Sequence, residues 1–168
     1  EQISHLILPG VGSFTSAMRR LSQAELIDPI NHYVKTGKPL LGICLGMQLL
    51  ADNGTEGGET NGLGFIEGSV VPFEIHSKFR IPHVGWNMLH EHKEHPLLDG
   101  IKRDVDFYFV HSYYFQSKNE NDVIAMTNYG LLYPSFIASN NVVGVQFHPE
   151  KSQKNGLIIL ENFLKWEL

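Results

Sequence analysis

Cys44 is the residue in this sequence best placed to act as a nucleophile. It follows a short apolar run at residues 40–43 and has a glycine two positions away on either side, in the pattern Gly42-x-Cys44-x-Gly46. Such glycines permit the sharp strand-to-helix turn of a nucleophile elbow, where a Cβ would collide with a neighbouring element. Residues 45–51 contain strong helix formers, and the start of a helix favours a thiolate over a thiol. A buried structural cysteine is the alternative interpretation, and the pattern alone leaves both open.

His148 and Glu150 form a second candidate pair, separated by Pro149. In an extended segment residues i and i+2 point to the same side, and Pro149 opposes helix formation. A carboxylate that binds one imidazole nitrogen fixes the tautomer and leaves the other nitrogen to take a thiol proton. Because sites of α/β proteins gather at the carboxyl ends of strands, we predict that Cys44, His148 and Glu150 meet as a triad.

The elements expected to position these residues are those of an α/β protein. The predicted strands are residues 3–8, 40–43, 70–73, 79–81, 106–116, 123–127, 135–139 and 142–147. The predicted helices are residues 15–33, broken at Asp28-Pro29, then 45–51 and 155–168, with a glycine-rich connection over residues 52–68. This order predicts an open, mostly parallel sheet flanked by helices. Asn140-Asn141 predicts an antiparallel hairpin extension in the C-terminal half.

Two other segments carry residues that could bind a ligand. The loop Pro9-Gly10-Val11-Gly12 has exposed N–H groups that could hold an anion, although glycines also serve a plain strand-to-helix connection. His90, His92 and His95 occur with Glu91 and Glu94, but their spacing matches no metal motif. We therefore interpret this polar stretch as a solvated loop, and expect no metal site.

Length and composition narrow the class of protein. A chain of 168 residues is suited to one domain, here residues 1–168. The net charge of −5 and the absence of any run of Lys or Arg argue against binding to nucleic acid or an anionic membrane. No apolar stretch reaches transmembrane length and no signal-peptide pattern opens the sequence, so a cytoplasmic protein is expected. The single cysteine excludes an internal disulfide.

Five motifs occur in the order found in the triad glutamine amidotransferases. They are Pro9-Gly10-Val11-Gly12, Gly42-Ile43-Cys44-Leu45-Gly46-Met47-Gln48, Pro82-His83-Val84-Gly85-Trp86-Asn87, Phe109-Val110-His111-Ser112-Tyr113 and Gln146-Phe147-His148-Pro149-Glu150-Lys151. The sequence resembles this family over nearly its whole length, and within it the glutaminase subunits of imidazole glycerol phosphate synthases. The resemblance implies a flavodoxin-like glutamine amidotransferase fold. That family begins with a strand, a helix and a further strand before the Pro-Gly-Val-Gly loop, so we expect an N-terminally incomplete chain.

The resemblance also implies a reaction and its residues. Cys44 is expected to attack the side-chain amide of glutamine, form a glutamyl thioester and release ammonia, with His148 as base and then acid. N–H groups of Leu45 and of Gly10 or Val11 are the expected oxyanion donors, and Gln48, Ser112 and Tyr113 the expected substrate contacts. No cofactor is implied. The implied partner is a (β/α)₈ cyclase subunit in a heterodimer, contacted by Trp86 and Lys151.

Other functions remain open at this point. A stand-alone cysteine hydrolase acting on γ-glutamyl compounds would use the same triad, although no extra substrate domain is visible. A non-enzymatic α/β module that merely retains a thiol is opposed by the presence of Cys44, His148 and Glu150 together. Within the family, related subunits supply ammonia to other synthases, including synthases that modify surface sugars.

Overall fold

The largest sheet supplies the strands that carry the candidate catalytic residues. The computed structural model describes residues 3–74, 78–90 and 92–167. In this part of the chain the sheet has five strands in the order β1 (Leu6–Gly10), β2 (Leu40–Cys44), β11 (Val142–Val145), β10 (Leu132–Ser139) and β9 (Val123–Asn128). Only β10 is reversed relative to the other four. The predicted mostly parallel sheet with a hairpin extension is therefore confirmed.

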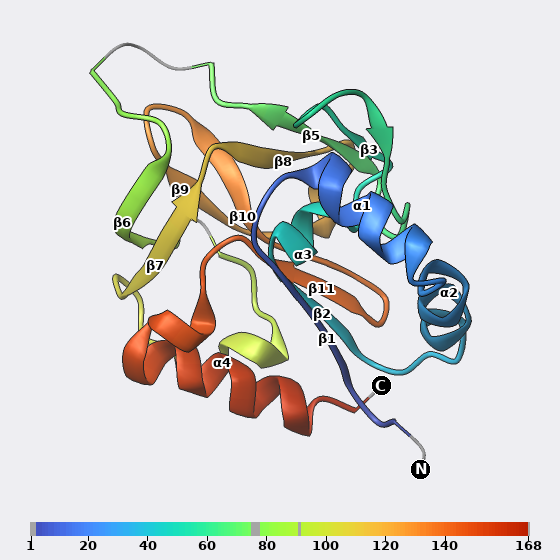
Figure 1. Cartoon of the computed structure of the whole chain (residues 1–168). Coiled ribbons are helices and arrows are strands. Elements are labelled where there is room, and N and C mark those ends of the chain that lie inside the picture. The colour runs from blue at the N-terminus through green and yellow to red at the C-terminus, as the bar shows by residue number, and fades with distance from the viewer. Residues whose placement is uncertain (1–2, 75–77, 91, 168) are drawn as a thin grey trace.

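Two smaller sheets flank this one (Figure 1). A four-stranded sheet contains β4 (Thr60–Asn61), β3 (Asn53–Gly54), β5 (Gly68–Pro72) and β8 (Tyr113–Ser117) in the described residues. A two-stranded ribbon pairs β6 (His83–Met88) with β7 (Asp106–His111). The connection predicted for residues 52–68 thus contains the short strands β3 and β4.

The prediction of one strand over residues 106–116 was wrong. The chain bends at Ser112, so that β7 pairs with β6 and β8 pairs with β5 in a different sheet. The aromatic and apolar composition is continuous across the bend, which is why composition did not reveal it. The strand predicted at residues 79–81 was also wrong, because this segment forms bends with half-exposed Phe79 and Ile81.

The helices of the described residues are α1 (Phe14–Gln23), α2 (Ile27–Lys35), α3 (Leu45–Gln48) and α4 (Gln153–Lys165). Short 3₁₀ helices cover Pro96–Leu98, Glu120–Asp122 and Pro149–Lys151. The break predicted at Pro29 instead falls at residues 24–26, where Glu25 has a φ of 54°. Pro29 lies in the first turn of α2, where its missing N–H has no intrahelical partner to lose. None of these helices is long and apolar enough to cross a membrane.

Both faces of the main sheet are covered by apolar side chains. Leu40 and Val142 pack with α1, α2 and α3 on one face, whereas Leu41 and Val143 pack with α4 on the other. Figure 1 shows α4 on the opposite side of β1, β2 and β11 from α1 and α2. This double burial explains why β2 is an unbroken apolar run. It also fixes β2 firmly, and Cys44 is its last residue.

Candidate active site

The predicted strand–turn–helix at Cys44 is present. β2 ends at Cys44 and α3 begins at Leu45, with Cys44 at φ 54° and ψ −110°. This backbone conformation is rare for a residue with a side chain, and strained residues of this kind cluster at active sites. A Cβ on Gly42 would lie 2.6 Å from the Gly46 carbonyl oxygen, and one on Gly46 would lie 1.7 Å from the Leu8 carbonyl oxygen. Both glycines are therefore required for the turn to pack against itself and against β1.

We expect Gly46→Ala to destabilise the protein by at least the ~1–3 kcal/mol typical of overpacking, because backbone rather than a flexible side chain must move. Urea unfolding would measure the loss. Gly100→Ala is a contrasting control: Gly100 has a positive φ of 78°, unlike Gly46, but its added Cβ would meet no described atom within 4 Å. The steric explanation predicts the larger loss for Gly46→Ala, and a loss no larger than that of Gly100→Ala, where only backbone strain acts, would contradict it.

His148 and Glu150 form the predicted pair, although by a different local route. β11 ends at Val145, and residues 149–151 form a 3₁₀ turn rather than an extended segment. Pro149 begins this turn, and the turn brings the His148 Nδ1 within 2.7 Å of the Glu150 Oε1. Because a carboxylate only accepts, Nδ1 carries the proton and Nε2 is left as the basic nitrogen. In the described part of the chain this buried Nε2 has no hydrogen-bond partner.

The backbone of His148 is fixed from two sides. Its N–H donates to the Tyr108 carbonyl oxygen at 2.8 Å, and its carbonyl oxygen accepts from the Ser152 Oγ at 2.6 Å. The Tyr108 N–H in turn donates to the Ser152 Oγ at 2.9 Å. The backbone that carries the imidazole is therefore held by β7 and by the residue that precedes α4.

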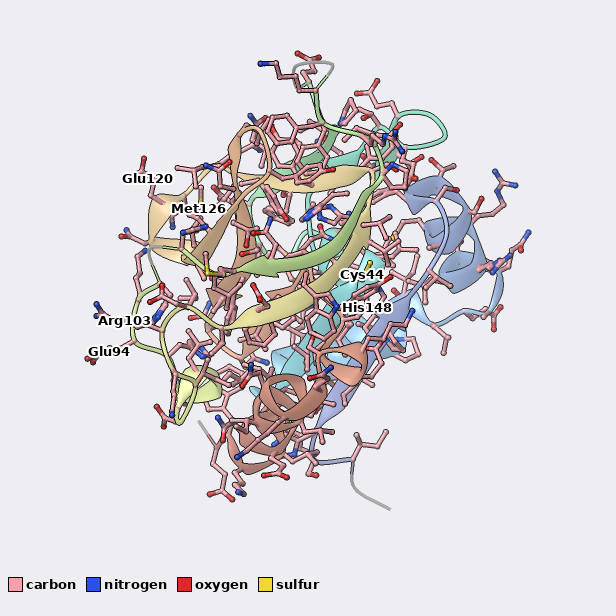
Figure 2. The ribbon with its side chains drawn as sticks, turned by 90° about the vertical axis from the view of Figure 1, so that its left-hand side faces the viewer. Cys44, Glu94, Arg103, Glu120, Met126 and His148 are labelled. Atoms are coloured by element: carbon pink, nitrogen blue, oxygen red, sulfur yellow. The ribbon has the colours of Figure 1, made fainter. Side chains whose placement is uncertain are left out.

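Cys44 and His148 face a common cavity of about 440 Å³. Figure 2 shows the two side chains next to each other, with Glu94 at the far edge of the molecule. Of the predicted site residues, the cavity is lined by Val11, Cys44, Leu45, Gln48, Ser112, Tyr113 and His148. Gly10 lies directly beside Cys44 in the β1–β2 register. One cavity thus unites motifs as far apart in the sequence as those of Val11 and His148.

Trp86 and Lys151 do not line this cavity, but both contact the same residue, Tyr108. The Trp86 ring makes an edge contact with Tyr108, with ring centroids 5.8 Å apart. The Lys151 Nζ lies 5.8 Å from the centroid of the same Tyr108 ring. Both side chains therefore flank the residue whose carbonyl oxygen binds the His148 N–H.

The resting state of Cys44 is a thiol. Burial raises the pKa of Cys44 to about 11, outweighing the opposing effect of the Leu45 N–H, and the Glu150 charge raises the pKa further. The Leu45 N–H at the start of α3 thus favours the thiolate, as expected, but α3 is one turn long and burial of the sulfur has the larger effect on the pKa. The thiol donates to the Val110 carbonyl oxygen at 3.7 Å, and the Gln146 Nε2 donates to the sulfur at 3.8 Å.

Several residues of the site were not predicted. Glu56 lines the cavity, its Oε2 accepts from the Phe14 N–H at 3.0 Å, and burial raises the pKa of this carboxyl. Its only signal in the sequence was its place in the glycine-rich segment interpreted as a connection. Gln146 is fully buried, and its signal was a polar residue within the apolar run at residues 142–147. His111 also lines the cavity, and burial lowers the pKa of this imidazole to about 3, so it is neutral at pH 7.

Two of the histidines of the polar stretch, His90 and His95, have different structural roles. The His90 backbone bridges to Met126, and the His95 ring contacts Phe136 and Trp166 while its Nδ1 accepts from the Leu97 N–H. Glu91 lies outside the described residues. Among the residues that the structure describes, no group of three or more His, Cys, Asp or Glu side chains could hold a metal ion.

Comparison with known proteins decides the family. Residues 3–166 match the model of the class-I glutamine amidotransferases. This chain belongs to that family. The amidotransferase is 50% identical over 164 residues to imidazole glycerol phosphate synthase subunit HisH of Desulfitobacterium hafniense, covering 98% of this chain and 77% of that relative. It is 48% identical to the subunit of the same name from Sulfurimonas denitrificans, covering 99% of this chain and 81% of the relative.

Solved structures agree on the fold. A crystal structure of a glutamine amidotransferase has a TM-score of 0.70 at 24% identity, covering 96% of this chain and 79% of that one. The PurLQS structure from Thermotoga maritima has a TM-score of 0.72 at 18% identity, with the same two coverages. The fold class predicted from the sequence motifs is therefore confirmed.

Proposed function

We propose that this amidotransferase is the glutaminase subunit of an imidazole glycerol phosphate synthase in histidine biosynthesis. It hydrolyses glutamine to glutamate and ammonia and supplies the ammonia to a (β/α)₈ cyclase subunit. The observation that carries the chemistry is the meeting of a strained Cys44 with a buried His148 Nε2 in one cavity, where this nitrogen has no hydrogen-bond partner among the described residues. The identity of about 50% to subunits named HisH supports the pathway.

The reaction follows from these groups. His148 Nε2 takes the thiol proton as Sγ attacks the amide carbon of glutamine, and the carbonyl oxygen becomes an oxyanion. Collapse of this intermediate breaks the C–N bond, the protonated His148 gives its proton to the leaving nitrogen, and ammonia departs. Water then attacks the thioester with His148 again as base. Glutamate leaves and Cys44 regains its proton.

The oxyanion donors are proposed from the positions of their N–H groups relative to Cys44. The Leu45 N–H is hydrogen-bonded to the Cys44 sulfur and lies at the start of α3. Gly10 pairs with Cys44 across the sheet, and Val11 lines the cavity, so this loop can bring a second N–H to the same side. In other enzymes one such donor contributes about 3 kcal/mol to transition-state stabilisation.

Substrate contacts are proposed for four residues of the cavity. The Gln48 Nε2 is committed to the Tyr113 carbonyl oxygen at 2.9 Å and to the Gln146 Oε1 at 3.1 Å, so its own Oε1 is the atom offered to glutamine. Ser112 and Tyr113 line the same wall. Glu56 places a carboxylate in the cavity, and this charge suits the α-ammonium group of an amino-acid substrate.

The cyclase is proposed to bind over Trp86 and Lys151. Trp86 is 48% exposed, and Val84 on the same strand is 55% exposed, which gives the ribbon an apolar outer surface. Both Trp86 and Lys151 contact Tyr108, which is hydrogen-bonded to His148. A partner that moves Tyr108 would thus act on a residue that is hydrogen-bonded to His148, a member of the triad.

We expect glutaminase activity to be low in the isolated subunit and to rise on the order of 10- to 100-fold when the cyclase binds its own substrate. The glycine-bearing loop, with Gly12 at φ 106°, can rotate a peptide so that either an N–H or a C=O faces Cys44. Release of glutamate, with and without the cyclase subunit, would measure this. Equal activities with and without the cyclase would contradict activation by the partner. Stimulation by a sugar-modifying synthase alone would contradict the proposed pathway.

The interface has its own test within that assay. Trp86→Ala is expected to weaken the stimulation without changing the free energy of unfolding, because this side chain is half-exposed. Leu164→Ala is a suitable control, since Leu164 is 61% exposed but lies in the last turn of α4, about 16 Å along the helix from its start at Gln153. If both variants are stimulated like the unchanged protein, Trp86 does not contact the partner.

A further inference from the structure

Gln146 is a fully buried polar side chain that the mechanism above does not use. It follows β11, and its neighbours Val145 and Phe147 are fully buried apolar residues. The β2–β11 pairing places Val145 beside Ile43, so the next residues along these parallel strands are Gln146 and Cys44. Burying an amide is costly unless its polar atoms are satisfied, so its partners reveal its purpose.

The orientation of the Gln146 amide is fixed by a carbonyl group. The Tyr113 carbonyl oxygen can only accept, and it lies 2.9 Å from the Gln48 amide nitrogen. The second N–H of that nitrogen points to Gln146, 3.1 Å away, and must meet an oxygen there. The Gln146 Oε1 therefore faces Gln48. The Gln146 Nε2 consequently faces the Cys44 sulfur, at 3.8 Å.

The Cys44 sulfur thus has two hydrogen-bond partners, and they favour opposite protonation states of the thiol. The Val110 carbonyl oxygen, at 3.7 Å, accepts a hydrogen bond from the S–H group and so favours the thiol. The Gln146 N–H favours the thiolate, because a donor binds an anionic acceptor more strongly than a neutral one. When His148 removes the proton, the Val110 oxygen becomes repulsive to the sulfur and the Gln146 N–H becomes its side-chain donor.

We propose that Gln146 is a positioning residue for the nucleophile. It holds the Cys44 sulfur by an N–H bond that strengthens as the thiolate forms, and through its Oε1 it also fixes the amide of Gln48. The proposal rests on the proposed glutaminase function, since it assigns a role in activating the same thiol. Burial raises the pKa of Cys44 to about 11, so a donor that lowers the free energy of the thiolate matters here.

The reaction of Cys44 with iodoacetamide tests this role without any turnover of glutamine. Only the thiolate reacts, and Cys44 is the single cysteine of the chain, so the rate against pH reports one group. Gln146→Met keeps a similar volume and removes the donor. We expect the apparent thiol pKa to rise by about one unit and the alkylation rate at neutral pH to fall about tenfold. The ultraviolet absorbance of the thiolate gives a second measure of the same pKa.

Thr127→Val is the matched control. Thr127 is also fully buried, and its hydroxyl is hydrogen-bonded to the Met88 carbonyl oxygen and to the Ser135 Oγ, neither of which belongs to a residue lining the cavity. We expect its alkylation profile to equal that of the unchanged protein, even where its stability is lower. A profile shifted equally in both variants would overturn the proposal, because loss of packing alone would then explain the shift.

Gln48→Met provides a second route should Gln146→Met fail to fold. It removes the donor that orients the Gln146 amide, so the amide is free to rotate and the thiol pKa is expected to rise by a smaller amount. An unchanged alkylation profile in whichever variant folds would overturn the positioning role. If the unchanged protein alkylates normally and yet releases no glutamate with its partner, the proposed function fails, and the role of Gln146 is still decided by its own profile.

Discussion

Replacing Cys44 by alanine is expected to abolish glutamine hydrolysis, with a fall in glutamate release on the order of 10⁴- to 10⁶-fold. Cys44 sits at the strained elbow between β2 and α3, in the same cavity as His148. Two serines also line this cavity, but the Ser13 Oγ donates to the Ser16 Oγ, and neither serine lies at the elbow. No thioester can form once the sulfur is removed.

The fold should tolerate this change, because alanine removes one buried sulfur and keeps the Cβ at the same backbone position. Urea unfolding of Cys44→Ala is expected to match that of the unchanged protein within about 1 kcal/mol. Ser13→Ala is the control, with activity close to that of the unchanged protein in the presence of the cyclase. Turnover retained in Cys44→Ala would contradict the thioester mechanism.

The parts of the fold that could be predicted are those set by residues close together in sequence. The glycines around Cys44, the Asn140-Asn141 turn and the His148–Glu150 pair each carry a short-range steric or hydrogen-bonding signal. The bend at Ser112 has no such signal, because the sheet that each flanking strand joins is decided by distant partners. The helix break near Glu25 was missed because Pro29 was compatible with the first turn of α2.

The unpredicted part of the site has a common physical origin. Gln146 reaches Cys44 because β11 lies beside β2, and that neighbour relation joins segments about a hundred residues apart. Val110 reaches the sulfur from β7, which belongs to another sheet. The raised pKa of Cys44 has the same cause, since burial is a property of the assembled layers. A local pattern could show the helix start but not the apolar surroundings that outweigh it.

The removal of His148 is expected to have an effect nearly as large as the removal of Cys44, because the two act as one unit. With a thiol pKa of about 11, only about one Cys44 side chain in 10⁴ is a thiolate at pH 7. His148 Nε2 avoids this limit by taking the proton during the attack, and no other side chain was found hydrogen-bonded to that nitrogen in the described residues. His148→Ala should therefore lose on the order of 10⁴-fold at pH 7.

The pH profile distinguishes a lost base from a damaged fold. In His148→Ala the residual rate should rise about tenfold per pH unit toward the thiol pKa of about 11, because the deprotonated sulfur gains population as pH rises. The unchanged protein should lack this steep dependence.

Glu150→Ala should lose less activity than His148→Ala, by a factor on the order of 10², because Nε2 still accepts a proton when its orienting partner is gone. His5→Ala, at the Trp166 carbonyl, is the control. A flat residual profile in His148→Ala, or a greater loss in Glu150→Ala, would show that His148 is not the base.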